Sequence, residues 1–318
     1  MDQAERLREL AKEKRAEFGL NTDPDSIESE EDKTYYHPQN VKKVIAIASG
    51  KGGVGKSNFT VNLAIELSKL GNRVMILDAD LGLANVDIIL GINPKYNLSH
   101  VISEQKDIKD IVTETDYGVK IIASGSGVKE LVNLSNQQRE KFICKISELE
   151  DLVDILLIDT GAGISKNTLS FIYASDYSIV ITTPEPTALM DAYGLIKVVS
   201  LSKNNIPLKL IVNMVSSKEE AKEIASRVIL LSRRFLNTFV EYYGLIFRDK
   251  NVLNSVMSQK PFTILYPTTK ASDCIRDIAK KISLKILKEN ENIKNLYNKS
   301  EIQIFNGMFK KIIDIFKQ

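Results

Sequence analysis

The stretch that decides the fold is IASGKGGVGKSN, residues 47–58. It contains the pattern G-x-x-x-x-G-K-[ST] as Gly50, Gly55, Lys56 and Ser57, after an apolar run and before a helix-forming run. Glycines let backbone N–H groups turn towards phosphate oxygens, and the N-terminus of the following helix adds favourable partial charge. The pattern therefore predicts a phosphate-binding loop in which Lys56 contacts the β- and γ-phosphates and Ser57 ligates Mg²⁺.

The remaining loop positions are expected to line the nucleotide as well. They are Gly52, Gly53, Val54 and Asn58. Lys51 is different, because an ordinary loop of this type needs one lysine and accepts almost any residue at this position. A second lysine there separates a generic nucleotide hydrolase from a more specialised one.

Outward from the loop, short apolar runs rich in β-branched residues alternate with longer helical stretches. The predicted strands are 41–49, 73–78, 119–124, 154–159, 177–183, 208–214 and 244–247, and the predicted helices are 56–70, 128–149, 165–174, 187–203, 217–238 and 270–289. Continuous apolar strands that alternate with helices indicate a mostly parallel sheet covered on both faces. We therefore expect an α/β fold of the P-loop NTPase class.

Carboxylates follow two of these strands, where such folds bind ligands. DILLIDTGAG ends a strand at Asp159, a position suited to hold the water shell of a metal ion. VMILDADLGLANVD ends another at Asp78, a second candidate for the metal site, with Asp80 two residues further on. Asp80 would face the same way as Asp78 and could orient an attacking water.

The composition argues against several classes of protein function. With 43% hydrophobic and 26% charged residues and a net charge of +2, the chain is typical of a globular protein, and no nucleic-acid partner is expected. Cys144 and Cys274 form no CxxC pair, and His37 and His100 are the only histidines, which argues against a zinc or iron–sulfur site. No apolar run approaches a membrane span and the first 20 residues are charged throughout, so we expect a cytoplasmic protein.

At this level of detail the sequence resembles one family. KGGVGKS is similar to the deviant Walker A loop of the MinD/ParA ATPases, DADLGLANVD to their switch I, and DTGAG to their switch II. TTPEPTALMDAYGLIK resembles the stretch that follows, and the resemblance covers about residues 42–285. It implies ATP and Mg²⁺ as cofactors and an ATP-bound homodimer. In that dimer Lys51 would reach the phosphates of the partner protomer, as an arginine finger does.

The resemblance also implies roles for single residues. Asp80 matches the catalytic aspartate and Asp159 the Walker B residue, while Asn213 matches an asparagine that contacts adenine. Asp249 lies in the segment that usually closes over the base. Two departures, Asn58 and the T-G of DTGAG in place of S-P, are compatible with slow or altered hydrolysis.

The end of the chain, 301–318, has the pattern of an amphipathic helix. Its apolar stripe is formed by Ile304, Phe305, Met308, Phe309, Ile312, Ile313 and Phe316. Three phenylalanines flanked by lysines favour reversible binding at the inner face of the cell membrane, with Phe305, Phe309, Ile312 and Phe316 as the contacts. The alternative is a last helix packed on the core.

The start of the chain predicts a partner. Residues 1–19 are rich in helix formers, and 20–40 read as an acidic flexible linker before an ATPase domain at 41–290. DQAERLRE resembles the DQAxxLR motif of the FlhG (YlxH) flagellar regulators, and the matching residues are Asp2, Gln3, Ala4, Leu7 and Arg8. That resemblance implies stimulation of the SRP-type GTPase FlhF and control of flagellar number and placement, with flagellar switch proteins as further partners. A division-site MinD-type or ParA-type positioning ATPase, or a non-hydrolysing ATP-binding scaffold, remains the alternative.

Overall fold

The computed structural model describes residues 43–80, 85–123, 125, 145, 148–202 and 204–297. All of them belong to the unit formed by residues 40–318. The predicted N-terminal helix, the linker and the amphipathic tail lie outside the described residues, as does nearly all of the helix expected over 128–149.

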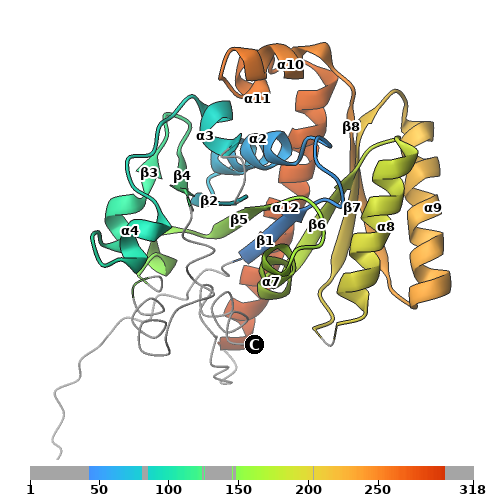
Figure 1. Ribbon diagram of the computed structural model, residues 1–318, viewed down its shortest axis with the longest axis horizontal. Helices are drawn as coiled ribbons and strands as arrows, with labels where there is room; N and C mark the ends of the chain where they lie inside the picture. The colour runs from blue at the N-terminus through green and yellow to red at the C-terminus, as the bar shows by residue number, and fades with distance from the viewer. Residues whose placement is uncertain are drawn as a thin grey trace, which may run out of the picture. The chain divides into compact units, whose positions relative to one another are not determined.

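The described strands form one sheet in the order β3-β4-β2-β5-β1-β6-β7-β8, with β3 alone antiparallel to its neighbour (Figure 1). The strands are β1 (Lys43–Ala48), β2 (Val74–Ala79), β3 (Thr113–Glu114), β4 (Val119–Ala123), β5 (Ile155–Thr160), β6 (Tyr177–Thr182), β7 (Leu208–Val215) and β8 (Val240–Phe247). The predicted mostly parallel α/β fold is confirmed.

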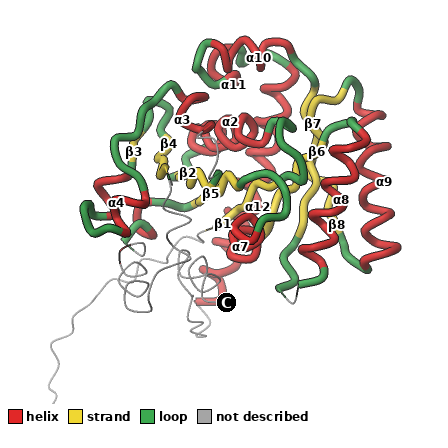
Figure 2. Tube along the Cα trace, viewed as in Figure 1, coloured by secondary structure: helices red, strands yellow, loops and turns green. Residues whose placement is uncertain are grey.

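Helices connect the strands, as the predicted alternation requires. They are α2 (Lys56–Lys69), α3 (Asn85–Leu90), α4 (Leu98–Ile102), η1 (Ile108–Ile111), η2 (Glu150–Leu152), α7 (Lys166–Ala174), α8 (Pro186–Ser200), α9 (Lys218–Leu236), α10 (Lys250–Met257), α11 (Phe262–Leu265) and α12 (Lys270–Tyr297). The helix expected over 270–289 therefore continues to Tyr297. Figure 2 shows the strands running between helices on both sides.

Side chains of the central strand β1 alternate between the two faces, which shows how the core is divided. Ile45 and Ile47 are fully buried against α2 and α12, in the cluster that also holds Phe59 and Ile275. Ala46 points to the opposite face, in the cluster formed with α8 and α9. Because both faces are covered, the ligand site has to lie at an end of the sheet, beyond β1.

Within the described residues, no helix combines the length and apolar character needed to cross a bilayer.

Candidate functional site: a phosphate loop at the carboxyl end of β1

The predicted loop lies between the end of β1 and the start of α2. Its last residue, Gly55, is the N-cap of α2 with φ 89°, a left-handed conformation that glycine adopts without strain. A Cβ at Gly55 would lie 2.4 Å from Nδ2 of Asn213, so the close approach of β7 also requires glycine. No side chain caps α2, whereas Ser165 caps α7 and Ser217 caps α9. The N-terminal amides of α2 therefore remain available for a phosphate.

Gly50, at the start of the loop, lies against the backbone of α8. A Cβ there would lie 2.1 Å from the carbonyl oxygen of Asp191, far inside van der Waals contact. Gly52 has open space around its Cβ position. Packing against α8 therefore requires glycine at position 50, whereas no contact within the described residues requires it at position 52.

Asp159 lies at the centre of a buried polar cluster. Its side chain is fully buried at the end of β5 and accepts hydrogen bonds from Ser57 Oγ at 2.6 Å and Thr60 Oγ1 at 2.8 Å. Lys56 Nζ forms an ion pair with Asp159 Oδ1 at 3.0 Å and is 7% exposed. Among the described residues no acceptor has hydrogen-bond geometry to this ammonium group. The structure thus brings Lys56, Ser57 and Asp159 together beside the loop.

This arrangement fits a magnesium nucleotide. A buried ammonium group without a hydrogen-bond acceptor is costly, and phosphate oxygens would supply the missing acceptor. In the part of the chain that the structure describes, no group of three or more His, Cys, Asp or Glu side chains could hold a metal ion alone. Mg²⁺ at a nucleotide needs fewer protein ligands, because phosphates and waters complete its shell. Ser57 would ligate the ion, and Asp159 would hold its water shell.

Asp78 and Asp80 lie beside this cluster. Asp78 pairs with Asp159 in the register of β2 and β5, and its Oδ1 accepts a hydrogen bond from the backbone N–H of Asp80 at 3.1 Å. Burial, and then the negative charge of Asp159, raise the pKa of Asp78 to about 7. Asp80 is half-buried, and its Oδ1 lies 3.7 Å from the Cβ position of Gly161 in DTGAG. The two stretches that follow β2 and β5 thus meet at Asp80.

Lys51 lies at the outer edge of the loop. Its ammonium group donates to Glu185 Oε2 at 2.8 Å and to Thr187 Oγ1 at 2.9 Å, both at the start of α8. This hydrogen bond, together with the positive charge of Lys51, lowers the pKa of the exposed Glu185 carboxyl. Lys51 therefore lies outside the Asp159 cluster, at a partly exposed position.

Asn213 and Asp249, which are expected near the adenine base, form hydrogen bonds within the chain. The side-chain amide of Asn213 donates to the carbonyl of Val54 at 2.7 Å, and its Oδ1 accepts from Met214 N. Met214 has φ 58°, a strained value for a non-glycine residue that is common at functional sites. Asp249 caps α10 through a hydrogen bond from Asn251 N.

The loop positions Gly53 and Asn58 complete the predicted set. Gly53 has φ 78° and open space around its Cβ position. Asn58 lies in the first turn of α2, and its Oδ1 is buried without a hydrogen-bond partner among the described residues. The side-chain oxygen and nitrogen of an asparagine are assigned from their hydrogen-bond partners. If a phosphate lies next to Asn58, the side chain would turn its NH₂ group towards it as a hydrogen-bond donor.

Sequence reasoning missed three contributors. Thr60 follows Lys56 by one helical turn, so it faces the same side and reaches Asp159, a signal that was available from the spacing. Glu185 and Thr187 hold Lys51 across 134 and 136 positions of the chain, and no local pattern could have revealed that contact.

The comparisons with known proteins identify the family. Residues 40–283 match the ParA family model, described as NUBPL iron-transfer P-loop NTPase. The chain belongs to the ParA/MinD family of P-loop NTPases.

Two curated relatives are similar to this chain over most of their length. The antiactivator FleN of Pseudomonas aeruginosa is 38% identical over 76% of this chain and 86% of its own. The flagellum site-determining protein YlxH of Helicobacter pylori is 35% identical over 78% of this chain and 84% of its own.

The fold has solved counterparts. The septum site-determining protein MinD of Pyrococcus horikoshii OT3, complexed with Mg-ADP, superposes with a TM-score of 0.61 at 23% identity, over 76% of this chain and 96% of that one. At this identity the likeness shows the fold alone.

Proposed function

We propose that this chain is an ATP-dependent dimerisation switch of the FlhG type that regulates flagellar number or placement. The observation that carries the nucleotide-binding part of the proposal is the buried cluster of Lys56, Ser57, Thr60 and Asp159 under the uncapped start of α2. This cluster offers a cation, a metal-ligating hydroxyl and a carboxylate where a triphosphate would lie. Bound Mg²⁺ would neutralise charge on the phosphates.

In this proposal, hydrolysis is slow and depends on the dimer. Asp80 orients the attacking water, and Lys51 acts in trans on the phosphates of the partner protomer. Its exposed position supports this role, because a lysine outside its own cluster is available to a second protomer once it leaves Glu185 and Thr187. The flagellar assignment is supported by the similarity to the flagellum site-determining protein YlxH.

The decisive experiment concerns Lys51→Ala, with Lys222→Ala on the exposed face of α9 as the matched control. Because Lys51 does not contact Asp159 in its own protomer, ATP affinity should fall only modestly. Dimerisation with ATP and phosphate release should fail together, whereas the control should behave as the native chain. Normal dimerisation of Lys51→Ala would show that this lysine is an ordinary surface residue.

The proposed FlhF partnership rests on Asp2, Gln3, Leu7 and Arg8 and has its own test. A peptide of residues 1–20 should accelerate GTP hydrolysis by an SRP-type GTPase, because a glutamine amide can position the attacking water. Gln3→Ala should reduce this stimulation, and Lys12→Ala should leave it unchanged. An inert native peptide would remove the flagellar assignment and leave an unspecified MinD-like ATPase.

Membrane association through 301–318 is likewise a proposal. Two amphipathic helices on one dimer gain avidity of about 10²–10⁴ when both reach the surface. ATP should therefore increase co-sedimentation with anionic liposomes, Phe309→Glu should abolish it, and Asn306→Glu on the polar face should have a smaller effect. Binding that ignores ATP would break the coupling, and no binding would favour a tail packed on the core.

Other functions of the family fit this chain less well. The family description includes iron transfer, which would need cysteine ligands. The sequence has only Cys144 and Cys274, which are 130 positions apart. DNA partitioning would need a basic surface, and the net charge is only +2.

A further inference from the structure

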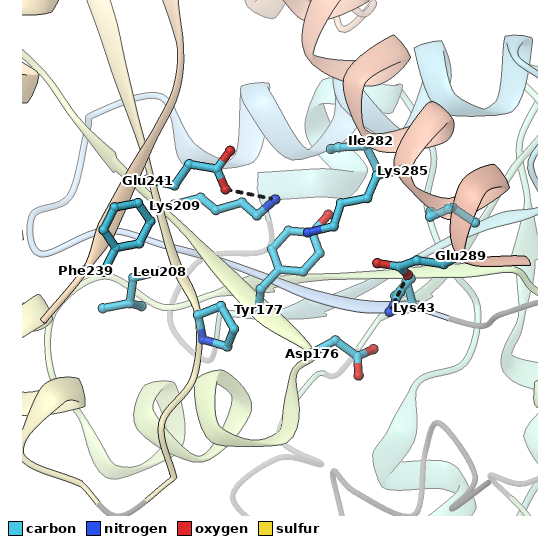
Figure 3. Close-up of a pocket in the computed structure, with 12 residues that line it drawn as sticks. Lys43, Asp176, Tyr177, Leu208, Lys209, Phe239, Glu241, Ile282, Lys285 and Glu289 are labelled. Carbon is cyan, nitrogen blue, oxygen red and sulfur yellow. Dashed lines mark ion pairs between the residues drawn. The ribbon is translucent and has the colours of Figure 1, made fainter. Parts of the chain in front are cut away.

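A cavity of about 220 Å³ lies at the end of the sheet away from the phosphate loop, where β1, β6, β7 and β8 begin. One wall is the sheet, which contributes Tyr177, Lys209 and Glu241. The other wall is the middle of α12, with Ile282 and Lys285 (Figure 3). The proposed ATPase activity makes no use of this cavity.

Lys209 is the unusual residue of this cavity. Its side chain is 3% exposed, and its ammonium group lies 3.8 Å from the ring centroid of Tyr243 and 4.2 Å from that of Tyr177. Glu241 Oε2 is 3.7 Å away, too far for a hydrogen bond, and among the described residues Nζ has no hydrogen-bond acceptor. Burial lowers the pKa of Lys209 to about 8, against the opposing effect of Glu241. The buried ammonium group therefore lacks one oxygen partner.

Most charged side chains of the cavity lining already have a polar partner. Glu241 is shared between Lys209 and Lys281, which lies 3.5 Å from its Oε1. Glu289 is paired with Lys43 at 2.8 Å, and Asp176 accepts a hydrogen bond from Val44 N.

Lys285 differs from the other lysines of the cavity. No carboxylate among the described residues forms an ion pair with it, and its Nζ lies 5.9 Å from the centroid of the Tyr177 ring. Figure 3 shows the ammonium groups of Lys285 and Lys209 entering the same space beside the ring of Tyr177. The remainder of the lining is largely apolar, with Ile282 and Ile286 opposite the ring.

We infer that this cavity binds a small monoanionic carboxylate with a planar apolar body. The carboxylate bridges Lys209 and Lys285, and the body lies between Tyr177 and the isoleucines of α12. One negative charge would pair with Lys285, whereas the second charge of a dianion would face Glu241. A volume of about 220 Å³ limits the ligand to the size of a single substituted ring.

The test uses the full-length chain at pH 7 and three probes: benzoate, its uncharged isostere benzamide, and inorganic phosphate. Saturation-transfer NMR and calorimetric titration should show saturable binding of benzoate, with benzamide at least about tenfold weaker, since an ionised hydrogen-bond partner is lost. Phosphate should also be weaker. Phosphate binding as tight as benzoate would refute the carboxylate assignment.

Variants then locate the site. Lys285→Gln changes an exposed residue and should weaken benzoate about tenfold or more, whereas Lys288→Gln, the same change at another exposed position of α12, should have no effect. Lys209→Met should abolish binding. ATP binding should be unaffected in all three variants, so failure here is separable from failure of the proposed ATPase. Absence of saturable benzoate binding, or full binding by Lys285→Gln, would overturn the inference.

Discussion

Replacing Thr60 by valine tests whether the Asp159 cluster stabilises the fold, because the change is nearly isosteric. Thr60 is fully buried, and its hydroxyl donates to Asp159 Oδ1 at 2.8 Å. A hydrogen bond to a charged group contributes about 1.5–3 kcal/mol. Because Lys56 and Ser57 still contact the carboxylate, we expect a loss near the lower value, about 1.5 kcal/mol. For a domain of this size that corresponds to a Tm lower by roughly 3–6 °C.

The chain offers a matched control for this substitution. Thr182, at the end of β6, is also fully buried, but its Oγ1 has no hydrogen-bond partner among the described residues. Thr182→Val should therefore keep or raise the Tm, since it removes an unsatisfied buried hydroxyl. Differential scanning calorimetry without nucleotide measures both variants. Equal Tm changes for the two, or an unchanged Tm for Thr60→Val, would refute the reasoning.

Two further predictions concern other sites. Gly50→Ala should lower ATP affinity about 100-fold, because its Cβ would lie 2.1 Å from the Asp191 carbonyl and displace the loop by about 1 Å. Gly194→Ala, in α8 with open space around its Cβ position, should bind ATP as the native chain does, and equal affinities of the two variants in a calorimetric titration would contradict the prediction. Lys209→Met should raise the Tm at pH 7, since burial lowers the pKa of Lys209 in the folded state to about 8 from 10.5. The charged lysine therefore lowers the stability of the native chain below pH 8, and this loss of stability is relieved as the pH rises towards 10.5. A Tm difference between variant and native chain that does not shrink by pH 10 would count against the prediction.

The charged and titratable groups that face Lys209 come from three elements. They are Tyr177 on β6, Glu241 and Tyr243 on β8, and Lys281 and Lys285 on α12. Glu241 favours the charged amine, and the two lysines disfavour it. The prediction therefore depends on burial exceeding the effect of Glu241.

The sequence predicted the phosphate loop and the sheet well, because both are local signals. The loop is a spaced motif between an apolar run and a helix, and seven of the eight described strands overlap a predicted apolar run. β3 was not predicted, because its residues Thr113 and Glu114 are polar, and β8 begins at Val240, before the predicted range 244–247. The short helices α3, α4, α10 and α11 were not predicted, since a helix of one or two turns carries too little periodicity to be recognised.

Contacts between distant segments could not be predicted. The pairing of Lys51 with Glu185 depends on how α8 packs beside the loop, which no local pattern encodes. The sequence LKLIVNM reads as an apolar strand, and only the position of α12 shows that its lysine, Lys209, lies in a buried cavity.

In the proposed function, ATP drives dimerisation and hydrolysis reverses it. Sedimentation velocity of Asp80→Ala with ATP and Mg²⁺, alongside the native chain and phosphate-release measurements, tests it most directly. If Asp80 orients the attacking water, the variant should accumulate as a stable dimer with ATP, remain a monomer with ADP, and release no phosphate. A variant that stays monomeric with ATP, or that hydrolyses ATP at the native rate, would contradict the account.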